Sequence, residues 1–377
     1  MSKLTVAYIA LAPFISGSER SLQATISQVS KMGVETLLIC PEDSPLLDWA
    51  NENNIRFESC GLKSLSADRY FLPSLYSQFR LCYLFIKYKI NIVHSNQIWS
   101  YPTIYWPAKL NGCSIVCHLR DPIGEGINWW MKRVPDAVIC VSQYLKSQFQ
   151  QHYRLIEKVN SVDALINPVV IPPTSTNSQR KILRQQSCSL FNISSQNMIF
   201  GFIGQISPVK GVFEMLEVLS EINHSNWQLL IAGDDPSKDQ AYLSKCKDLV
   251  VTLGIAKQVH FIGFQKDVSH FFYATDCILM FSKREPLGRV PLEAGAYYTP
   301  SIVNNIDGLP ETLIDGKSGY LISLSDITHT VKTLLSISIE DSEKMGLEAR
   351  IFVEKNTEVK LYCEKIIELY ISLNEVK

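Results

Sequence analysis

The 377-residue sequence has no Cys-x-x-Cys pair, no apolar run long enough to span a membrane and no excess of charge of one sign. Its ten cysteines, several of them within apolar runs, therefore indicate free buried thiols rather than a zinc site or a disulfide framework. With 36 Lys and Arg against 37 Asp and Glu, the chain is not expected to bind nucleic acid. The apolar fraction of 46% excludes a disordered chain, and the length predicts two domains.

A targeting segment is not expected either. The first apolar run, Leu4–Ile15, contains Pro13 and has no basic leader beyond Lys3. This composition is more typical of a first buried strand than of a signal peptide. Together with the thiols and the lack of a stretch of about 18 apolar residues, it predicts a cytoplasmic protein.

Short apolar runs alternate with longer stretches of helical period, which predicts a parallel α/β architecture. The expected strands are residues 4–12, 36–40, 92–94, 114–118, 137–141, 199–203, 228–232, 260–262, 277–281 and 300–303. The expected helices are residues 19–32, 73–88, 143–150, 212–222, 240–253 and 291–298. Because this pattern continues on both sides of residue 170, we expect two doubly wound parallel sheets that bind ligands at the carboxyl ends of their strands.

The segment 167–196 interrupts the alternation with three prolines and a run of Thr, Ser and Asn. This composition predicts an extended linker between the two domains, although residues 180–191 within it have helical character.

The stretch 282–295, S-K-R-E-P-L-G-R-V-P-L-E-A-G, places two carboxylates around an expected helix start. Glu285 follows a strand, and Glu293 lies within a helix that starts near Pro291, since proline is favoured in a first helical turn. Each carboxylate can accept two hydroxyl hydrogens, as a sugar and a ribose present them. The backbone N–H groups of Gly288–Val290 can stabilise an anion such as phosphate. Two solvated acids near a helix start are the structural alternative.

The stretch Phe200–Gly211, F-G-F-I-G-Q-I-S-P-V-K-G, places a lysine at the tip of a strand-to-helix loop. Lys210 can neutralise a diphosphate there, and the glycine after it lets the backbone approach the ligand. The stretch is neither a Walker A loop nor a dinucleotide G-x-G-x-x-G motif. The alternative is a surface lysine beside a turn glycine.

Taken together, these motifs resemble the retaining glycosyltransferases of family 4 in both order and spacing. The matching motifs are G-x5-K-G, L-L-I-A-G-D (229–234), V-x-F-x-G-F (259–264), E-x7-E and D-G-L-P-E (307–311). The first half agrees through Ser16-Gly17-Ser18-Glu19, His118, the stretch 136–142 and Asn167-Pro168.

The resemblance implies the GT-B fold, with two Rossmann-like, doubly wound parallel-sheet domains facing each other across a cleft. Residues 1–170 would bind the acceptor and residues 171–355 the nucleotide sugar. Residues 356–377 would form a C-terminal helix that packs back on the first domain.

The resemblance also implies the roles of individual residues. His118, Glu285 and Lys210 would be the catalytic residues, with Glu285 on the sugar hydroxyls, Lys210 on the diphosphate and His118 close to the transferred sugar. The other donor contacts would come from Gly17, Gly204, Gln205, Phe264, Lys266, Leu287, Gly288, Arg289, Val290 and Glu293. Of these, Glu293 would bind the ribose, Phe264 and Lys266 would border the base, and the backbone at 287–290 would hold sugar and phosphate.

Two positions differ from the family pattern. Gln205 stands where the family often has arginine, so stabilisation of the leaving group would rest more on Lys210, with Arg284 or Arg289 as compensating candidates. Ser16 replaces the first glycine of a double glycine, which a serine tolerates only where its backbone is not strongly left-handed.

The implied reaction is transfer of a sugar, with retention, from a nucleotide-diphosphate sugar to a glycan or lipid-linked acceptor, as in surface polysaccharide or lipopolysaccharide-type biosynthesis. No cofactor or metal is expected. The alternatives are a nucleotide-sugar epimerase of GT-B fold and a non-catalytic sugar-nucleotide-binding protein. A glycoside hydrolase using Glu285 and Glu293 leaves Lys210 unexplained. We interpret Asp234 and Asp235 as solvated turn acids, and His94 as a residue at a strand end rather than a metal ligand.

Basic and aromatic residues are concentrated between Arg69 and Arg133, where eight basic residues stand against two acidic ones. In one interpretation the aromatics form core and the lysines form a solvated rim. In the other, the segment Trp129–Arg133 contacts an anionic bilayer or a lipid-linked acceptor, giving peripheral association at the inner face of the membrane.

Overall fold

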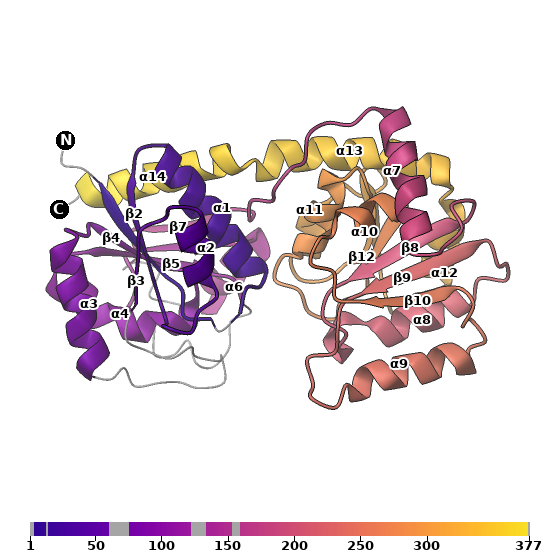
Figure 1. Cartoon of the computed structure of the whole chain (residues 1–377), viewed down its shortest axis with the longest axis horizontal. Coiled ribbons are helices and arrows are strands. Elements are labelled where there is room, and N and C mark those ends of the chain that lie inside the picture. Colours follow the sequence, from indigo (N-terminus) through magenta and orange to yellow (C-terminus); the bar gives the residue numbers. More distant parts are fainter. Residues whose placement is uncertain (1–3, 13, 60–74, 122–132, 153–158, 376–377) are drawn as a thin grey trace. The chain divides into compact units, whose positions relative to one another are not determined.

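The computed structural model describes residues 4–12, 14–59, 75–121, 133–152 and 159–375 (Figure 1). The chain divides into two compact units. Unit 1 contains residues Met1–Val169 and Thr357–Lys377, and unit 2 contains residues Val170–Asn356.

Unit 1 is built on a seven-stranded parallel sheet in the order β3-β2-β1-β4-β5-β6-β7. Its strands are β1 (Thr5–Ile9), β2 (Glu35–Cys40), β3 (Phe57–Ser59), β4 (Ile92–Ser95), β5 (Ser114–Leu119), β6 (Ala137–Cys140) and β7 (Ser161–Ala164). Its helices are α1 (Gly17–Lys31), α2 (Leu46–Glu52), α3 (Leu75–Lys87), the short η1 (Ile98–Ser100), α4 (Tyr101–Leu110), α6 (Gln143–His152) and α14 (Val359–Glu375).

Unit 2 is built on a six-stranded parallel sheet in the order β10-β9-β8-β11-β12-β13. Its strands are β8 (Met198–Ile203), β9 (Trp227–Ala232), β10 (Val259–Gly263), β11 (Cys277–Met280), β12 (Ser301–Asn304) and β13 (Gly319–Ile322). Its helices are α7 (Asn177–Leu190), η4 (Pro208–Lys210), α8 (Val212–Ser220), α9 (Ala241–Thr252), α10 (Ser269–Ala274), α11 (Arg289–Ala296), η5 (Leu309–Thr312), α12 (Ile327–Ser336) and α13 (Ile339–Thr357), whose last residue already belongs to the second segment of unit 1.

The two sheets confirm the predicted α/β fold and explain its sequence pattern. Central strands such as β1, β5 and β11 are buried along their whole length, because helices cover both faces of each sheet. In each unit the strand order reverses once, between β1 and β4 and between β8 and β11. Such a reversal leaves a crevice at the carboxyl ends of the two strands, where ligands of doubly wound sheets bind.

The C-terminal helix α14 belongs to unit 1, where it packs beside α1. Its buried side chains are Tyr362, Cys363, Ile366, Tyr370 and Leu373, which join the core formed by β1, β4, β5 and α1. The last residues of the chain therefore complete the core of the first unit.

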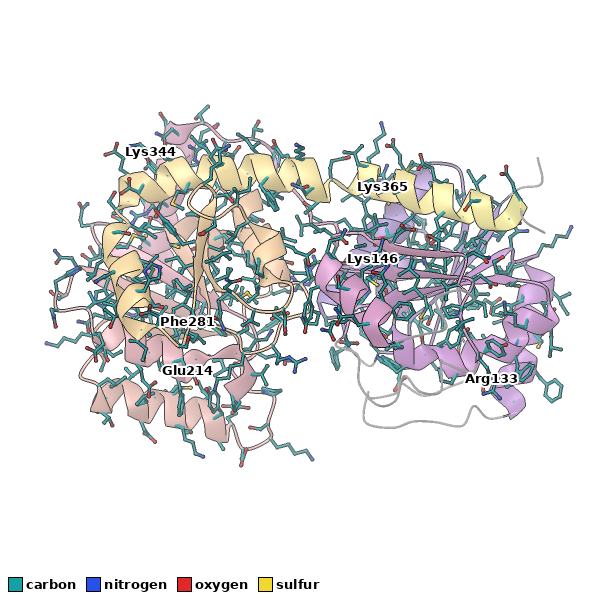
Figure 2. The ribbon with its side chains drawn as sticks, turned by 180° about the vertical axis from the view of Figure 1, so that it is seen from behind. Arg133, Lys146, Glu214, Phe281, Lys344 and Lys365 are labelled. Atoms are coloured by element: carbon teal, nitrogen blue, oxygen red, sulfur yellow. The ribbon has the colours of Figure 1, made fainter. Side chains whose placement is uncertain are left out.

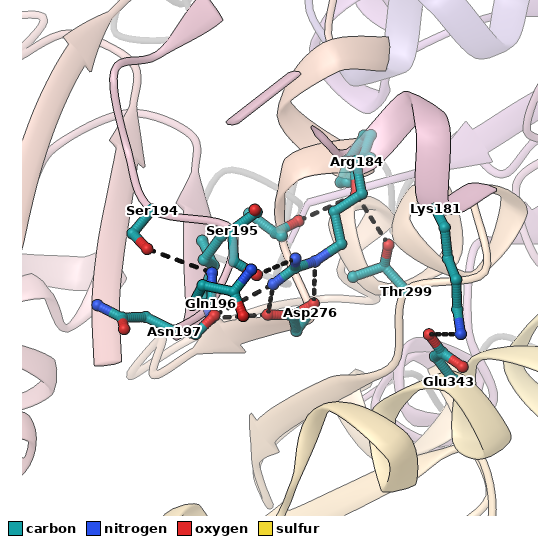
Figure 3. A network of polar contacts seen from close by, with 12 residues as sticks. Lys181, Arg184, Ser194, Ser195, Gln196, Asn197, Asp276, Thr299 and Glu343 are labelled. Carbon is teal, nitrogen blue, oxygen red and sulfur yellow. Dashed lines mark hydrogen bonds and ion pairs between the residues drawn. The ribbon is translucent and has the colours of Figure 1, made fainter. Parts of the chain in front are cut away.

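The segment after Val170 contains α7, which begins with a capping box between Thr176 and Gln179 and includes all of the expected helix 180–191 except Phe191, its C-cap. Arg184 of α7 donates two hydrogen bonds to Asp276, from Nε at 2.7 Å and from Nη2 at 2.9 Å (Figure 3). Asp276 also accepts from the backbone N–H of Ile199 at 2.8 Å. This network attaches α7 to the beginnings of β8 and β11.

The basic and aromatic region lies partly outside the described residues, because Trp129, Trp130, Met131 and Lys132 are not among them. Of the described aromatics, Phe85 is buried, whereas Phe79 and Tyr83 are exposed. The interpretation of these aromatics as core is therefore wrong for Phe79 and Tyr83. In the parts of the chain that the structure describes, no helix combines the length and the apolar character that a membrane crossing requires.

Candidate functional site

At the carboxyl edge of the sheet in unit 2, the loops that follow β8 and β9 are hydrogen-bonded to the last residues of the neighbouring strands β9 and β10. Gly204 N–H donates to Ala232 O at 3.0 Å, and Gly233 N–H donates to Gly263 O at 2.9 Å. At Gly233, where φ is +129°, a Cβ atom would stand 1.9 Å from Gly204 O. The backbone after β8 is therefore fixed by glycine-dependent contacts before the chain reaches Lys210.

The Lys210 loop is attached to the end of β11. Gly211 has φ of +68°, and a Cβ atom there would stand 2.0 Å from the carbonyl oxygen of Phe281, a buried residue whose position Figure 2 shows. In addition, Lys283 N–H donates to Val209 O at 2.8 Å. These contacts bring the loops after two neighbouring strands together at the point where the strand order reverses.

Lys210 and Glu285 form an ion pair across these two loops, with 2.6 Å between Nζ and Oε2. Their side chains are 26% and 14% exposed, so both are largely shielded but can still be reached by a ligand. The structure thus brings together a cation and a carboxylate that lie 75 residues apart in the sequence.

The loop Asp307–Glu311 positions Glu285. Asp307 Oδ2 accepts the backbone N–H of Glu285 at 3.0 Å and Arg284 Nε at 3.2 Å. Gly308 N–H donates to Glu285 O at 3.0 Å, and a Cβ atom on Gly308 would stand 2.0 Å from Pro286 O. A side chain at residue 308 would therefore displace the backbone that holds Glu285.

Helix α11 begins at Arg289, two residues before the predicted start, because Gly288 forms its N-cap in a left-handed conformation with φ of +88°. No side chain caps this helix, and its first turn contains no acidic residue. The positive end of the helix dipole is therefore not neutralised by the helix's own side chains, which suits an anionic group. Leu287 and Gly288 are buried beneath this turn, and Val290 is half-buried.

Glu293 is inside α11 as predicted, and it accepts hydrogen bonds from Arg289 Nε at 3.1 Å and Nη2 at 3.0 Å. Arg284 is bonded to Asp307, as described above. Both arginines considered as substitutes for the family's arginine at residue 205 are thus held by carboxylates of this edge, while Gln205 itself is exposed. Phe264 and Lys266 are exposed in the loop that follows β10.

The interpretation of Asp235 as a solvated acid is wrong. Its Oδ2 accepts the backbone N–H groups of Tyr242 and Leu243 at the start of α9, at 2.8 and 3.1 Å, and its Oδ1 accepts from Ser237. These hydrogen bonds, above all those from Ser237, lower the pKa of the Asp235 carboxyl. Asp235 therefore orders the first turn of α9, whereas Asp234 is exposed. Among the described residues, no three His, Cys, Asp or Glu side chains are grouped as a metal site requires.

In unit 1, the loop after β1 ends in a capping box. Ser16 is the N-cap of α1 with φ of −106°, so the serine is tolerated there, and Gly17 is the first residue of the helix. The Glu19 carboxylate is fully buried and accepts the N–H of Ser16 at 3.0 Å and Nε2 of Gln97 at 2.8 Å. This carboxylate joins the loops that follow β1 and β4, where the strand order of unit 1 reverses.

His118 lies near the end of β5 in a buried polar network. Its Nδ1 contacts Arg120 Nη2 at 3.2 Å and His94 Nε2 at 3.3 Å. His94 Nδ1 is hydrogen-bonded in turn to the hydroxyl of Tyr370, which also contacts the hydroxyl of Tyr8. A residue of the last helix is therefore connected to the predicted catalytic histidine through one intervening side chain.

The surroundings of His118 fix its protonation. Burial, with Arg120 and His94 close by, holds the pKa of His118 well below its usual value, and burial lowers the pKa of His94 to about 3. Because Arg120 is always a donor, Nδ1 of the neutral His118 accepts and its proton is on Nε2. This Nε2 is buried without a hydrogen-bond partner within the described structure. His118 thus presents an unsatisfied N–H donor that a ligand oxygen could accept.

Residues 190–352 match the family Glycosyl transferases group 1, and residues 15–162 match the family Glycosyltransferase Family 4. The chain belongs to these glycosyltransferases. One curated relative of this glycosyltransferase is the N-acetyl-alpha-D-glucosaminyl L-malate synthase of Bacillus anthracis, which is 29% identical over 184 residues. That alignment covers 48% of this chain and 46% of the relative, and the chain spans about half the length of such curated relatives.

Solved structures agree with the GT-B fold of this glycosyltransferase. A glycosyltransferase from Rickettsia africae ESF-5 has a TM-score of 0.82 at 19% identity and covers 99% of both chains. The Anabaena protein HepE in complex with UDP-glucose has a TM-score of 0.79 at 18% identity, covering 98% of this chain and 100% of that one.

Some residues of these two edges were not found from the sequence of this glycosyltransferase. The buried role of Glu19 had a local signal, since Ser16 and Glu19 fit the S-x-x-E capping pattern. Asp307 was part of a recognised motif, but its hold on Glu285 depends on the fold. Tyr370 had no local signal, because 276 residues separate it from His94.

Proposed function

We propose that this glycosyltransferase moves a sugar from a nucleotide-diphosphate sugar to a hydroxyl of a glycan or lipid-linked acceptor, with retention at the anomeric carbon, in polysaccharide or lipopolysaccharide-type biosynthesis. The observation that carries the proposal is the ion pair between Lys210 and Glu285 at the strand-order reversal of unit 2, beside the uncapped start of α11. The neighbour HepE was crystallised with UDP-glucose, which supports a nucleotide sugar as the donor class.

When the donor binds, its groups replace the ion pair that Lys210 and Glu285 form with each other. The diphosphate takes Lys210 and the first turn of α11, and this releases Glu285 to accept hydrogen bonds from the sugar hydroxyls. Glu293, which Arg289 holds in place, accepts the ribose hydroxyls. The exposed ring of Phe264 supplies an apolar surface for the base.

Unit 1 supplies the second part of the reaction. His118 donates its Nε2–H to an oxygen of the transferred sugar, because this donor is buried and otherwise unsatisfied. The acceptor binds to unit 1, whose carboxyl edge carries the buried Glu19 and Gln97.

The bond between the anomeric carbon and the phosphate oxygen breaks, and the acceptor oxygen forms a bond to the same face of that carbon. The departing phosphate oxygen takes the acceptor's proton. Lys210 and the helix dipole stabilise the negative charge that develops on the diphosphate, in place of a metal ion. We therefore expect activity to persist when divalent cations are removed with a chelator.

A thermal-shift titration with UDP-glucose and other nucleotide sugars tests donor binding. A true donor at about 100 times its dissociation constant stabilises the protein by about 2.7 kcal/mol, and Lys210→Met should abolish most of this shift. If no nucleotide sugar changes the melting temperature of the unaltered protein, the proposed donor site is wrong.

Product analysis then separates transfer from its alternatives. Transfer consumes the donor only when an acceptor is present, whereas an epimerase converts it alone and a binding protein leaves it unchanged.

A further inference from the structure

Helix α3 carries an apolar stripe on its outer face. Tyr76, Phe79, Tyr83 and Ile86 follow the three- and four-residue spacing of a single helix face. Each of these side chains is between 58% and 72% exposed. Ordinary protein surfaces expose single, scattered apolar residues, whereas this helix exposes four in one continuous stripe.

The opposite face of α3 is already occupied. Leu81, Leu84 and Phe85 are buried in unit 1. A helix that is apolar on both faces is typical of one that is covered on both sides. The exposed stripe therefore indicates that α3 meets a second apolar environment.

The neighbouring helix α4 extends this surface. It packs against α3, and Gln78 Nε2 of α3 donates to Thr103 O of α4 at 2.6 Å. Trp106 and Leu110 of α4 are 51% and 75% exposed. We call the six exposed side chains the docking face; they are Tyr76, Phe79, Tyr83, Ile86, Trp106 and Leu110.

The charge around the docking face has one dominant sign. From Tyr76 to Cys113, which spans α3 and α4, the sequence contains four basic residues and no acidic one. Lys87 Nζ lies 5.9 Å from the ring centre of Tyr83, and the guanidinium of Arg133 lies 5.7 Å from that of Trp106, with Arg133 labelled in Figure 2. Lys89 is exposed just beyond the end of α3.

Two acids only partly offset these cations. Glu58 is paired with Lys87 at 2.9 Å and with Arg80 at 3.6 Å, and Asp136 is paired with Lys109 at 2.9 Å. Four basic residues of α3, α4 and the turns that follow them, Arg80, Lys87, Lys89 and Lys109, thus stand against these two carboxylates, which leaves a net charge of +2.

We propose that the docking face binds the surface of an anionic lipid bilayer. Tyrosine and tryptophan suit the boundary between head groups and acyl chains because their rings are apolar and their tips are polar. The lysines keep their ammonium groups at the lipid phosphates while their stems cover apolar surface. A second copy of the chain is disfavoured as the occupant, because pairing two such faces brings like charges together. This inference does not depend on the proposed donor site.

Co-sedimentation of the full chain with vesicles tests the proposal. The protein should bind vesicles of phosphatidylcholine with phosphatidylglycerol, bind vesicles of phosphatidylcholine alone much more weakly, and lose binding as salt is raised. Equal binding to both vesicles, or none to the anionic ones at low salt, would overturn it.

Variants locate the contact on the molecule. Phe79→Ser with Ile86→Ser removes apolar contact, and Lys89→Glu reverses a charge; each should weaken anionic-vesicle binding by roughly tenfold or more. The matched controls are Val251→Ser and Lys332→Glu, which change an exposed valine and an exposed lysine of unit 2. Controls that lose binding as strongly as the docking-face variants would overturn the proposed location.

Quenching by brominated lipid gives a second readout. Emission from the unaltered protein should be quenched on anionic vesicles, and Trp106→Phe should lose part of that quenching. Sedimentation equilibrium without lipid tests the alternative that the docking face pairs two copies of the chain. We expect no dimer that the double variant Phe79→Ser with Ile86→Ser converts to monomer. Such a dimer, or quenching that Trp106→Phe does not change, would assign the face to another partner.

Discussion

At the scale of single residues, the ion pair of Lys210 and Glu285 makes two proposed substrate contacts depend on each other. Removing either partner leaves the other charged and unpaired in a shielded position, which alters its response to the donor. We therefore expect their effects on catalysis to be strongly coupled.

Lys210→Met and Glu285→Gln should each lower kcat/KM by about 10²-fold or more. The kcat/KM of the double variant should be only slightly lower than that of the less active single variant. Steady-state kinetics measures all three. The ion pair between Lys283 and Glu214, with 2.5 Å between its atoms, provides a matched control on the same edge, and Lys283→Met should leave kcat/KM unchanged. Near-normal turnover in both single variants of the first pair would refute the site.

His94 predicts a pH dependence of stability in unit 1. Its pKa falls from an ordinary value of 6.5 to about 3 on burial. Between these two pH values the histidine is protonated in the unfolded chain but neutral in the folded chain. The contribution of neutral His94 to the free energy of unfolding is therefore complete above about pH 6.5. It is lost as the pH falls from there towards 3, by up to about 1.4 kcal/mol per pH unit.

His94→Gln should accordingly make the free energy of unfolding fall less steeply between neutral and acidic pH. Urea denaturation at a series of pH values measures this slope. His224→Gln, which replaces an exposed histidine of unit 2, should leave it unchanged. An identical slope in the His94 variant would contradict the neutral, buried histidine described here.

At the scale of elements, the loop between β8 and α8 depends on a glycine whose backbone and surroundings both exclude a side chain. Gly211→Ala should cost about 1–2 kcal/mol for the left-handed backbone and more for the contact with Phe281 O. Gly254, with φ of +72° and no atom within 4 Å of a Cβ, is the matched control and should lose only the backbone part. Urea denaturation measures both costs, and equal costs in the two variants would show that the Phe281 contact is not tight.

The elements also show how far the sequence predicts the fold. All ten expected strands are present. Nine of them are central strands, which are buried on both faces and are therefore mainly apolar, and the tenth, β10, is an edge strand. The three that were not expected, β3, β7 and β13, are edge strands of their sheets. An edge strand has one neighbour and a partly exposed surface, so its sequence does not need such a run, as the half-buried Ser161–Ala164 illustrates.

The same reasoning applies to the candidate site. Lys210 and Glu285 could be predicted, because loops at the carboxyl ends of adjacent parallel strands meet at one edge. The pairing of Lys210 with Glu285, and of Arg289 with Glu293, could not, because it depends on the loop contacts of Gly211 and Asp307. Tyr370 reaches His94 only because the last helix returns to the first sheet.

At the scale of the whole molecule, the two units differ in how their chain is assembled. Unit 2 is one continuous stretch, 170–356, whereas unit 1 needs residues 357–377 in addition to 1–169. A fragment of residues 170–356 should therefore fold alone, as circular dichroism and a cooperative urea transition would show. Residues 1–169 alone should not, because α14 supplies buried side chains to their core.

Adding a peptide of residues 357–377 should restore folding to the first fragment. A peptide of the same composition with Ile366 and Tyr370 replaced by serine should fail to do so, because both side chains are fully buried. Cooperative unfolding of residues 1–169 without any peptide would contradict this division.

This division has a consequence for synthesis on the ribosome. The strands of the unit 1 sheet precede unit 2 in the sequence, whereas α14 follows it. The part of the unit 1 core that α14 covers therefore stays exposed while the entire second unit is translated. Unit 2 can reach its native state while the nascent polypeptide is still attached, since domains generally fold as they are made. Termination of translation before α14 would therefore release a protein whose unit 2 is folded and whose unit 1 is exposed to chaperones and proteases.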